Sequence, residues 1–176
     1  DLWASAISEE SDLAAALEEC AGKVASKLGP DSPVTLAIVF ASVIYNDAAA
    51  DVSRILGERF PGAMILGCSG AGIIGNAKEI EGQPAVALTV GHLPDVEAKP
   101  FRFISDELPS PDEPPHACSA LLGVSPEENP SFLVLTDPFS IAGEGLLSRL
   151  YYEFPSSVHV RSAARRSSQA CPSPLC

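Results

Sequence analysis

Gly67-Cys68-Ser69-Gly70-Ala71-Gly72-Ile73-Ile74-Gly75 is the stretch of this sequence on which the interpretation of the fold depends. The apolar residues 63–66 precede it and predict a short buried strand. Glycine has no side chain, so this density of glycines indicates backbone that turns tightly or that another group approaches closely. We therefore expect residues 67–75, called the glycine stretch below, to form a loop with a positive φ at Gly70 or Gly72.

Apolar periodicity around the glycine stretch predicts a mixed α/β fold, with a mixed sheet of about five to six strands flanked by helices. A strand, a helix and a second strand precede the stretch, which is the order of a right-handed crossover between parallel strands. Residues 84–90 and 97–104 are expected to pair as antiparallel strands. The expected strands lie at 2–7, 34–43, 63–66, 84–90, 97–104, 132–136 and from 157, and the expected helices at 13–28, from 46 or 47 to 60, and at 141–154.

The last expected helix has an apolar side formed by Leu146, Leu147, Leu150 and Tyr151, which we predict to be buried. The prolines in residues 105–116 predict a loop over the surface. We expect one domain over residues 1–160, followed by a disordered basic tail at 161–176. That tail has three arginines, no acidic residue and too little apolar surface to order itself.

The charge of the chain excludes several classes of partner. Its 176 residues carry a net charge of −12, whereas binding to nucleic acid or an anionic membrane surface requires clustered lysine and arginine. The five cysteines are widely spread without a C-x-x-C pair, which is typical of a reducing compartment. We expect a cytoplasmic location, with an organelle such as a plastid left open, and no cofactor or metal. No run approaches the ~18 apolar residues that a membrane-spanning helix needs.

One interpretation of the glycine stretch is a dinucleotide-binding loop. Gly70, Gly72 and Gly75 have the spacing of that fingerprint, and Asp95 lies where a ribose-binding acid would be expected. The pyrophosphate of such a site binds at the N-terminus of a helix that opens at the glycines. Eight residues separate Gly75 from Pro84, fewer than the ~10–12 that a crossover helix needs. This shortage disfavours the dinucleotide interpretation.

A second interpretation is the nucleophile elbow of a hydrolase, Gly-x-Ser-x-Gly. Ser69 occupies the serine position, but Ala71 stands where the last glycine belongs. Asp137 and His159 follow in the order that an α/β-hydrolase triad would need, yet the elbow also requires a helix behind the serine. Cys68 as a nucleophile would need a base from His92, His116 or His159. Small residues packed under a turn remain the favoured explanation, and no catalytic residue is predicted.

A third interpretation rests on a resemblance to a known family. The residues that carry it are 3–8 (WASAIS), 37–42 (AIVFAS), 60–63 (FPGA), 65–75, Glu79, 84–88 (PAVAL) and 137–139 (DPF). Over roughly residues 3–160 the chain resembles the N-terminal part of the FIST domain (F-box and intracellular signal transduction). The resemblance implies a cytosolic input module for small ligands of the kind found in bacteria, with amino acids proposed. In eukaryotes the module also accompanies F-box segments of ubiquitin ligases.

The resemblance implies a non-enzymatic sensory or interaction module. Its implied partners are a small-molecule ligand and a FIST C-terminal domain or ubiquitin-ligase subunits. The glycine stretch is the expected contact region, because bare glycine amides can bind a carboxylate without side-chain charge. Glu79 is a candidate for receiving an ammonium group, and strand ends often line crevices. The candidate ligand-binding residues are Gly67, Cys68, Ser69, Gly70, Gly72, Gly75, Glu79, Ser42 and Asp137. A small serine hydrolase using Ser69 and a pure protein-interaction scaffold remain alternatives.

The sequence departs from the family pattern after Val160. The family continues with a glycine pair and small residues, whereas this chain has Arg161-Ser162-Ala163-Ala164-Arg165-Arg166. Two explanations stay open, a flexible C-terminus and a reading frame that leaves the family's, as in a truncated isoform. Without a FIST C-terminal half, we expect this form to be an incomplete binder if the ligand site lies between the halves.

Overall fold

A computed structural model of the chain describes residues 2–29, 32–45, 49–102, 116–136 and 142–163. The described residues form two compact units that meet in sequence at residues 100 and 101. Each unit combines strands with helices, so the predicted mixed α/β class is confirmed. No helix among the described residues is long and apolar enough to cross a membrane.

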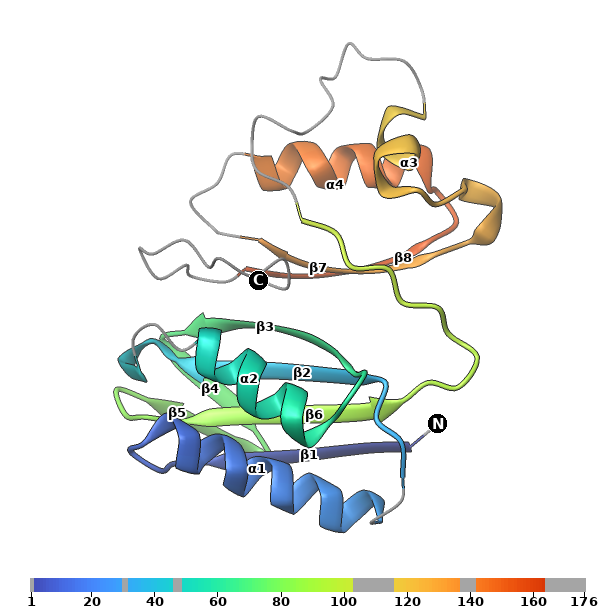
Figure 1. The fold of residues 1–176 in the computed structure, drawn as a ribbon. Helices are drawn as coiled ribbons and strands as arrows, with labels where there is room; N and C mark the ends of the chain where they lie inside the picture. The colour runs from blue at the N-terminus through green and yellow to red at the C-terminus, as the bar shows by residue number, and fades with distance from the viewer. Residues whose placement is uncertain (1, 30–31, 46–48, 103–115, 137–141, 164–176) are drawn as a thin grey trace. The chain divides into compact units, whose positions relative to one another are not determined.

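The first unit is built on a four-stranded sheet in the order β1-β6-β2-β3 (Figure 1). Strands β2 and β3 are parallel and are joined by a helix, which confirms the predicted crossover, whereas β6 is antiparallel to both β1 and β2. The elements are β1 (Leu2–Ser8), α1 (Leu13–Leu28), β2 (Leu36–Ser42), the short helix η1 (Val43–Tyr45), α2 (Ala49–Arg59), β3 (Met64–Gly70), β4 (Gly72–Gly75), β5 (Lys78–Glu81) and β6 (Val86–His92).

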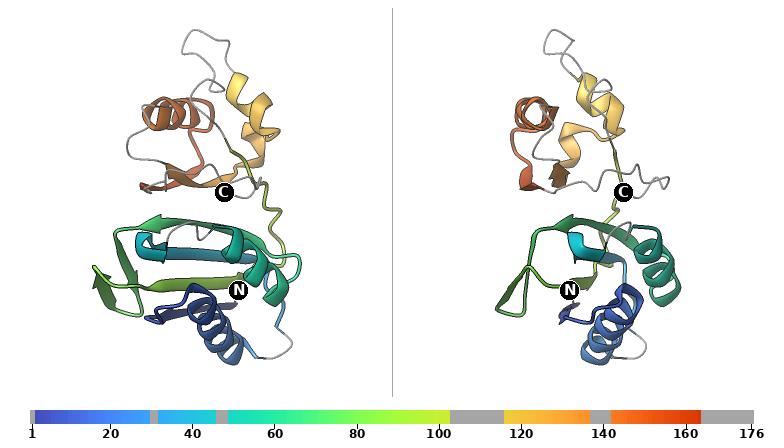
Figure 2. Two further views of the ribbon diagram at one scale, coloured as in Figure 1. Left: turned by 60° about the vertical axis from the view of Figure 1, so that its left-hand side comes forward. Right: turned by 90° about the vertical axis from the view of Figure 1, so that its left-hand side faces the viewer.

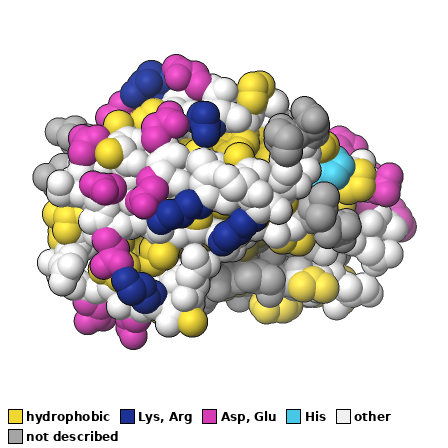
Figure 3. Space-filling view, turned by 90° about the horizontal axis from the view of Figure 1, so that it is seen from below, with side chains coloured by type: hydrophobic (Ala, Val, Ile, Leu, Met, Phe, Trp, Pro, Cys, Tyr) yellow, Lys and Arg dark blue, Asp and Glu magenta, His cyan; other side chains and the backbone are white. Residues whose placement is uncertain are grey.

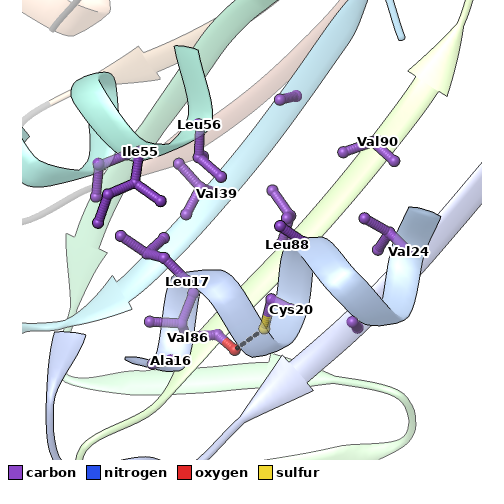
Figure 4. Packing of buried hydrophobic residues seen from close by; sticks show 14 of the residues in the cluster. Ala16, Leu17, Cys20, Val24, Val39, Ile55, Leu56, Val86, Leu88 and Val90 are labelled. Atoms are coloured by element: carbon purple, nitrogen blue, oxygen red, sulfur yellow. Dashed lines mark hydrogen bonds between the residues drawn. The ribbon is translucent and has the colours of Figure 1, made fainter. Parts of the chain in front are cut away.

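Helices α1 and α2 cover one face of this sheet (Figure 2). The Asp12 carboxylate accepts a hydrogen bond from the Ala15 N–H at 2.9 Å and begins α1, and Gly29, with a φ of 98°, ends it. Figure 4 shows the apolar side chains that fill the interface between these helices and the sheet. This core includes Leu17, Cys20, Val24, Val39, Ile55, Leu56, Val86, Leu88 and Val90.

A small hairpin of β4 and β5 covers part of the opposite face (Figure 2). Its turn is Asn76-Ala77, both with positive φ (49° and 60°), as a two-residue hairpin turn requires. Ile73 and Ile80 are buried side by side against Ala87 of β6. The glycine stretch is therefore a strand end, a bend and a second strand rather than one loop. The predicted positive φ at Gly70 or Gly72 is wrong, because both lie in extended backbone at these strand ends.

The predicted strand at 97–104 is also wrong for residues 97–102, which form no strand, and residues 103–104 lie outside the described residues. The reason is topological. Both sides of β6 are already paired, one with β1 and the other with β2. The following segment therefore has no side of β6 to join, and the largest sheet among the described residues has four strands rather than five or six.

The second unit contains α3 (Ala117–Leu122), η3 (Pro126–Glu128), β7 (Ser131–Thr136), α4 (Ala142–Glu153) and β8 (Val158–Ala163). Strands β7 and β8 are parallel, and β7 and α4 agree with the predicted strand and helix. Leu146 and Leu150 are buried as predicted, but Leu147 is only partly buried and Tyr151 is 57% exposed. Phe154 is buried as well. Strand β8 continues to Ala163, three residues into the segment expected to be disordered, and residues 164–176 lie outside the described residues.

Candidate functional site

The parallel strands β2 and β3 end side by side, and their last residues bring together part of the predicted site. In the register of the pair, Phe40 lies opposite Cys68 and Ser42 lies opposite Gly70. Crevices at the carboxyl ends of parallel strands are common ligand sites in α/β proteins. The structure therefore places Ser42 and Gly70 at one end of the sheet, whereas Gly67 lies opposite Val39 in the middle of β3.

Ser42 is buried, with 2% of its surface exposed. Its N–H donates to the Ala85 carbonyl at 2.8 Å, and its Oγ accepts from the Ile44 N–H at 3.3 Å. These bonds connect β2 to the segment before β6 and begin the turn into η1. Ser42 thus has a structural role in which its hydroxyl acceptor is already used.

Gly67 is required by the packing of β3 on β2. A Cβ atom at this position would lie 2.0 Å from the Val39 carbonyl oxygen and 2.7 Å from Val39 Cγ1. Gly75 is also close to neighbouring side chains, since its Cβ would lie 3.3 Å from Ala87 Cβ and 3.4 Å from Ile7 Cδ1. At these two positions the absence of a side chain is explained by packing within the sheet and the hairpin.

The amides of β3 divide into two groups by direction. The Met64 N–H donates to the Thr35 carbonyl at 2.9 Å, on the β2 side. Because successive residues of a strand direct their N–H groups to alternate sides, Cys68 and Gly70 also direct theirs toward β2. Gly67 directs its N–H to the other side of β3, and β3 is the last strand of the four-stranded sheet. Gly67 therefore presents an amide without side-chain shielding at the sheet edge.

Cys68 does not have the environment of a catalytic thiol. Burial raises the pKa of its thiol to about 11, so the group is protonated at neutral pH, whereas a nucleophilic cysteine needs the thiolate. In the register of the sheet, His92 is paired with Leu2 and lies near the opposite end from Ser42 and Cys68. The side chain of His159 is outside the described residues.

The hairpin carries the rest of the predicted site. Gly72 and Gly75 begin and end β4, and Glu79 lies opposite Ile74 in β5. Ile74 is 70% exposed, and both residues alternate with the buried pair Ile73 and Ile80. Glu79 is therefore exposed on the outer side of the hairpin, away from the sheet face that the hairpin covers. Asp137 lies outside the described residues.

The local structure after Gly70 does not fit either enzyme motif considered for this stretch. A dinucleotide site and a hydrolase elbow both need a helix that opens at the glycines. Residues 72–75 instead form β4, and residues 78–81 return as β5. Among the described parts of the chain, no group of three or more His, Cys, Asp or Glu side chains could hold a metal ion.

An open hollow of about 190 Å³ lies at the other end of β2 and β3. The Leu93 N–H donates to Thr35 Oγ1 at 2.9 Å and holds the segment after β6 at its rim. No residue pattern in the sequence indicated this hollow, because segments distant in sequence form it. It is lined by Thr35, Leu36, Gly62, Met64, Leu93, Val96 and Ala98.

Comparison with known proteins gives one positive result. A family model described as FIST N domain matches residues 35–160, from the residue before β2 to the middle of β8. No curated protein and no solved structure matches the chain.

Proposed function

This chain belongs to the FIST N domain family, and from that premise we propose that it binds a small ligand with a carboxylate group, such as a free amino acid. The family points to a sensory module of signal transduction. The proposed site is the outer edge of β3 over residues 67–70, from the middle of the strand to its carboxyl end. The location we propose is the cytoplasm.

The observation that carries the proposal is the direction of the Gly67 amide. Its N–H points away from β2 at the last strand of the sheet, and the residue has no side chain to cover it. Main-chain N–H groups stabilise an anion through their dipoles without a lysine or arginine. This mode suits a small carboxylate better than a polyanion, because a chain with a net charge of −12 repels a large negative partner.

The direct test is a titration of the full chain with free amino acids, one at a time, followed by NMR of the backbone amides. We expect the Gly67 amide resonance to shift with ligand, while Gly22, in the middle of α1 and with open space around it, stays unchanged. A bound ligand should also raise the melting temperature by mass action.

A pair of variants separates ligand binding from general stability. Gly70→Ala adds a Cβ 3.0 Å from the Gly72 carbonyl oxygen and alters the backbone at the proposed site, whereas Gly22→Ala adds one in open space. The ligand-induced rise in melting temperature should shrink in the first variant and persist in the second. A complete amino-acid panel with no shift at Gly67 would refute the proposed ligand. Capture of FIST C-terminal or ubiquitin-ligase partners without any ligand response would instead favour a protein-interaction scaffold.

A further inference from the structure

Strand β1 forms one edge of the four-stranded sheet, and β6 is its strand neighbour (Figure 1). An edge strand has N–H and C=O groups on its outer side that can pair with a strand of another molecule. The sequence of β1, LWASAIS, contains no charged residue, proline or glycine. That composition favours pairing between identical strands.

The register of the sheet shows which groups of β1 face outward. The Ser42 N–H donates to the Ala85 carbonyl, directly before β6, so the odd-numbered residues of this segment bond with β2. The even-numbered residues of β6 therefore bond with β1, at its own even-numbered positions. Ser5 and Ile7 consequently direct their carbonyl oxygens away from the sheet.

Two lysines of α1 donate hydrogen bonds to these outward carbonyls. Lys23 Nζ donates to the Ile7 carbonyl at 3.1 Å, and Lys27 Nζ donates to the Ser5 carbonyl. Lys23 Nζ also lies 2.8 Å from Glu19 Oε1, which positions its ammonium group beside β1. Seen from below Figure 1, where α1 and β1 are the lowest elements, the surface has basic and acidic side chains close together (Figure 3).

We propose that β1 is a pairing surface for a second copy of this chain. Lys23 and Lys27 prevent this pairing because they donate hydrogen bonds to the outward carbonyls of β1. Without the two ammonium groups, the carbonyls of Ser5 and Ile7 are available to the N–H groups of an antiparallel β1 from another molecule. Such a contact is self-complementary about a two-fold axis. A second copy is the favoured occupant because β1 has no charged side chain, so two β1 strands can pair without placing like charges opposite each other.

The test compares the full chain with its Lys23→Ala, Lys27→Ala double variant by sedimentation velocity over a range of concentrations. The matched control is Arg54→Ala with Arg59→Ala, which removes the same charge from the surface of α2. Lys23→Arg with Lys27→Arg retains donors at both positions. We expect a concentration-dependent shift from monomer toward dimer in the lysine-to-alanine variant, and in neither of the other two.

Hydrogen exchange identifies the surface involved. In the associating variant, exchange of the Ser5 and Ile7 amides should slow, because their outward N–H groups become paired. A folded variant, checked by circular dichroism, that keeps the mass of the wild type at every concentration would overturn the proposal. Association with unchanged exchange at Ser5 and Ile7 would also overturn it. If the double variant does not fold, Lys27→Ala alone frees the Ser5 carbonyl and leaves the Lys23–Glu19 ion pair in place. This single variant should shift toward dimer less than the double variant would, and a mass equal to that of the wild type at every concentration would overturn the proposal.

Discussion

Substitution of Gly67 by alanine tests the account of the glycine stretch most directly. The new Cβ would lie 2.0 Å from the Val39 carbonyl oxygen, and contacts below 3.0 Å are essentially not found for real Cβ atoms. Strand β3 must therefore move from β2 by about 1 Å or more. A displacement of that size stretches two or three ladder hydrogen bonds beyond useful length, at a cost of about 1 kcal/mol each.

The unfolded state offsets part of this cost. Alanine restricts the unfolded chain more than glycine does, which favours folding by roughly 0.4–1 kcal/mol. The net destabilisation of Gly67→Ala is then about 2 kcal/mol, or a fall in melting temperature of roughly 4–8 °C for a chain of this length. Gly22→Ala is the control, because its Cβ meets nothing within 4 Å in the interior of α1. It should stabilise the chain by about 0.5–1 kcal/mol.

Thermal unfolding followed by circular dichroism, with urea unfolding as a second measurement, compares the three proteins. The prediction is a lower melting temperature for Gly67→Ala and a higher one for Gly22→Ala. If Gly67→Ala melts within about 1 °C of the wild type, the close approach of β3 to Val39 is not the reason for glycine at this position.

Three further predictions concern contacts within the first unit or within the second. Gly91→Ala should displace the Trp3 ring, whose nearest atoms lie 2.7 Å from the added Cβ. Because Trp3 is the single tryptophan of the chain, we expect its fluorescence emission to shift to the red in this variant. Unchanged emission would contradict the contact. Burial raises the pKa of the Cys20 thiol to about 11, so ionisation in the unfolded state above about pH 8.5 lowers the free energy of unfolding as pH rises toward 11. In Cys20→Ala, the free energy of unfolding measured with urea should fall less steeply with pH over that window. A fall as steep as that of the wild type would refute this cause. Glu153, whose side chain is 1% exposed, accepts hydrogen bonds from the Cys118 and Ser119 N–H groups at 3.1 and 2.9 Å. Glu153→Leu should therefore destabilise the chain by about 2–4 kcal/mol, and Glu153→Gln should destabilise it less. Urea unfolding measures both, and free energies of unfolding equal to that of the wild type in both variants would refute the prediction.

Helices α1, α2 and α4 and most strands of this fold could be predicted because their signals are local, whereas α3 was missed. Helix α1 has apolar residues at helical spacing, an N-cap at Asp12 and a stop at Gly29, and these are independent of the rest of the chain. The hairpin was missed because Asn76-Ala77 lacks the Asn-Gly or Asp-Gly signal of a two-residue turn. The false strand at 97–104 had the right alternation, but its exclusion depends on the pairing of both sides of β6, which no local pattern encodes.

The candidate site was predicted less well because a glycine in a strand can serve either of two purposes. Sequence alone cannot distinguish a glycine that exposes an amide from one that lets two strands approach closely. In the structure, packing explains the missing side chains at Gly67 and Gly75. Glu79 faces away from the sheet surface that the hairpin covers.

The density of glycines in residues 67–75 is therefore not in itself evidence for a ligand. Packing against Val39 requires glycine at position 67 whether or not anything binds there. A loss of ligand response in Gly67→Ala would be ambiguous, because the substitution also separates β3 from β2. What distinguishes the binding proposal from packing is the outward Gly67 N–H, a group that every residue except proline would retain. The decisive measurement is consequently the resonance of that amide in the unaltered chain, since it can respond to a carboxylate without any change in the contact with Val39.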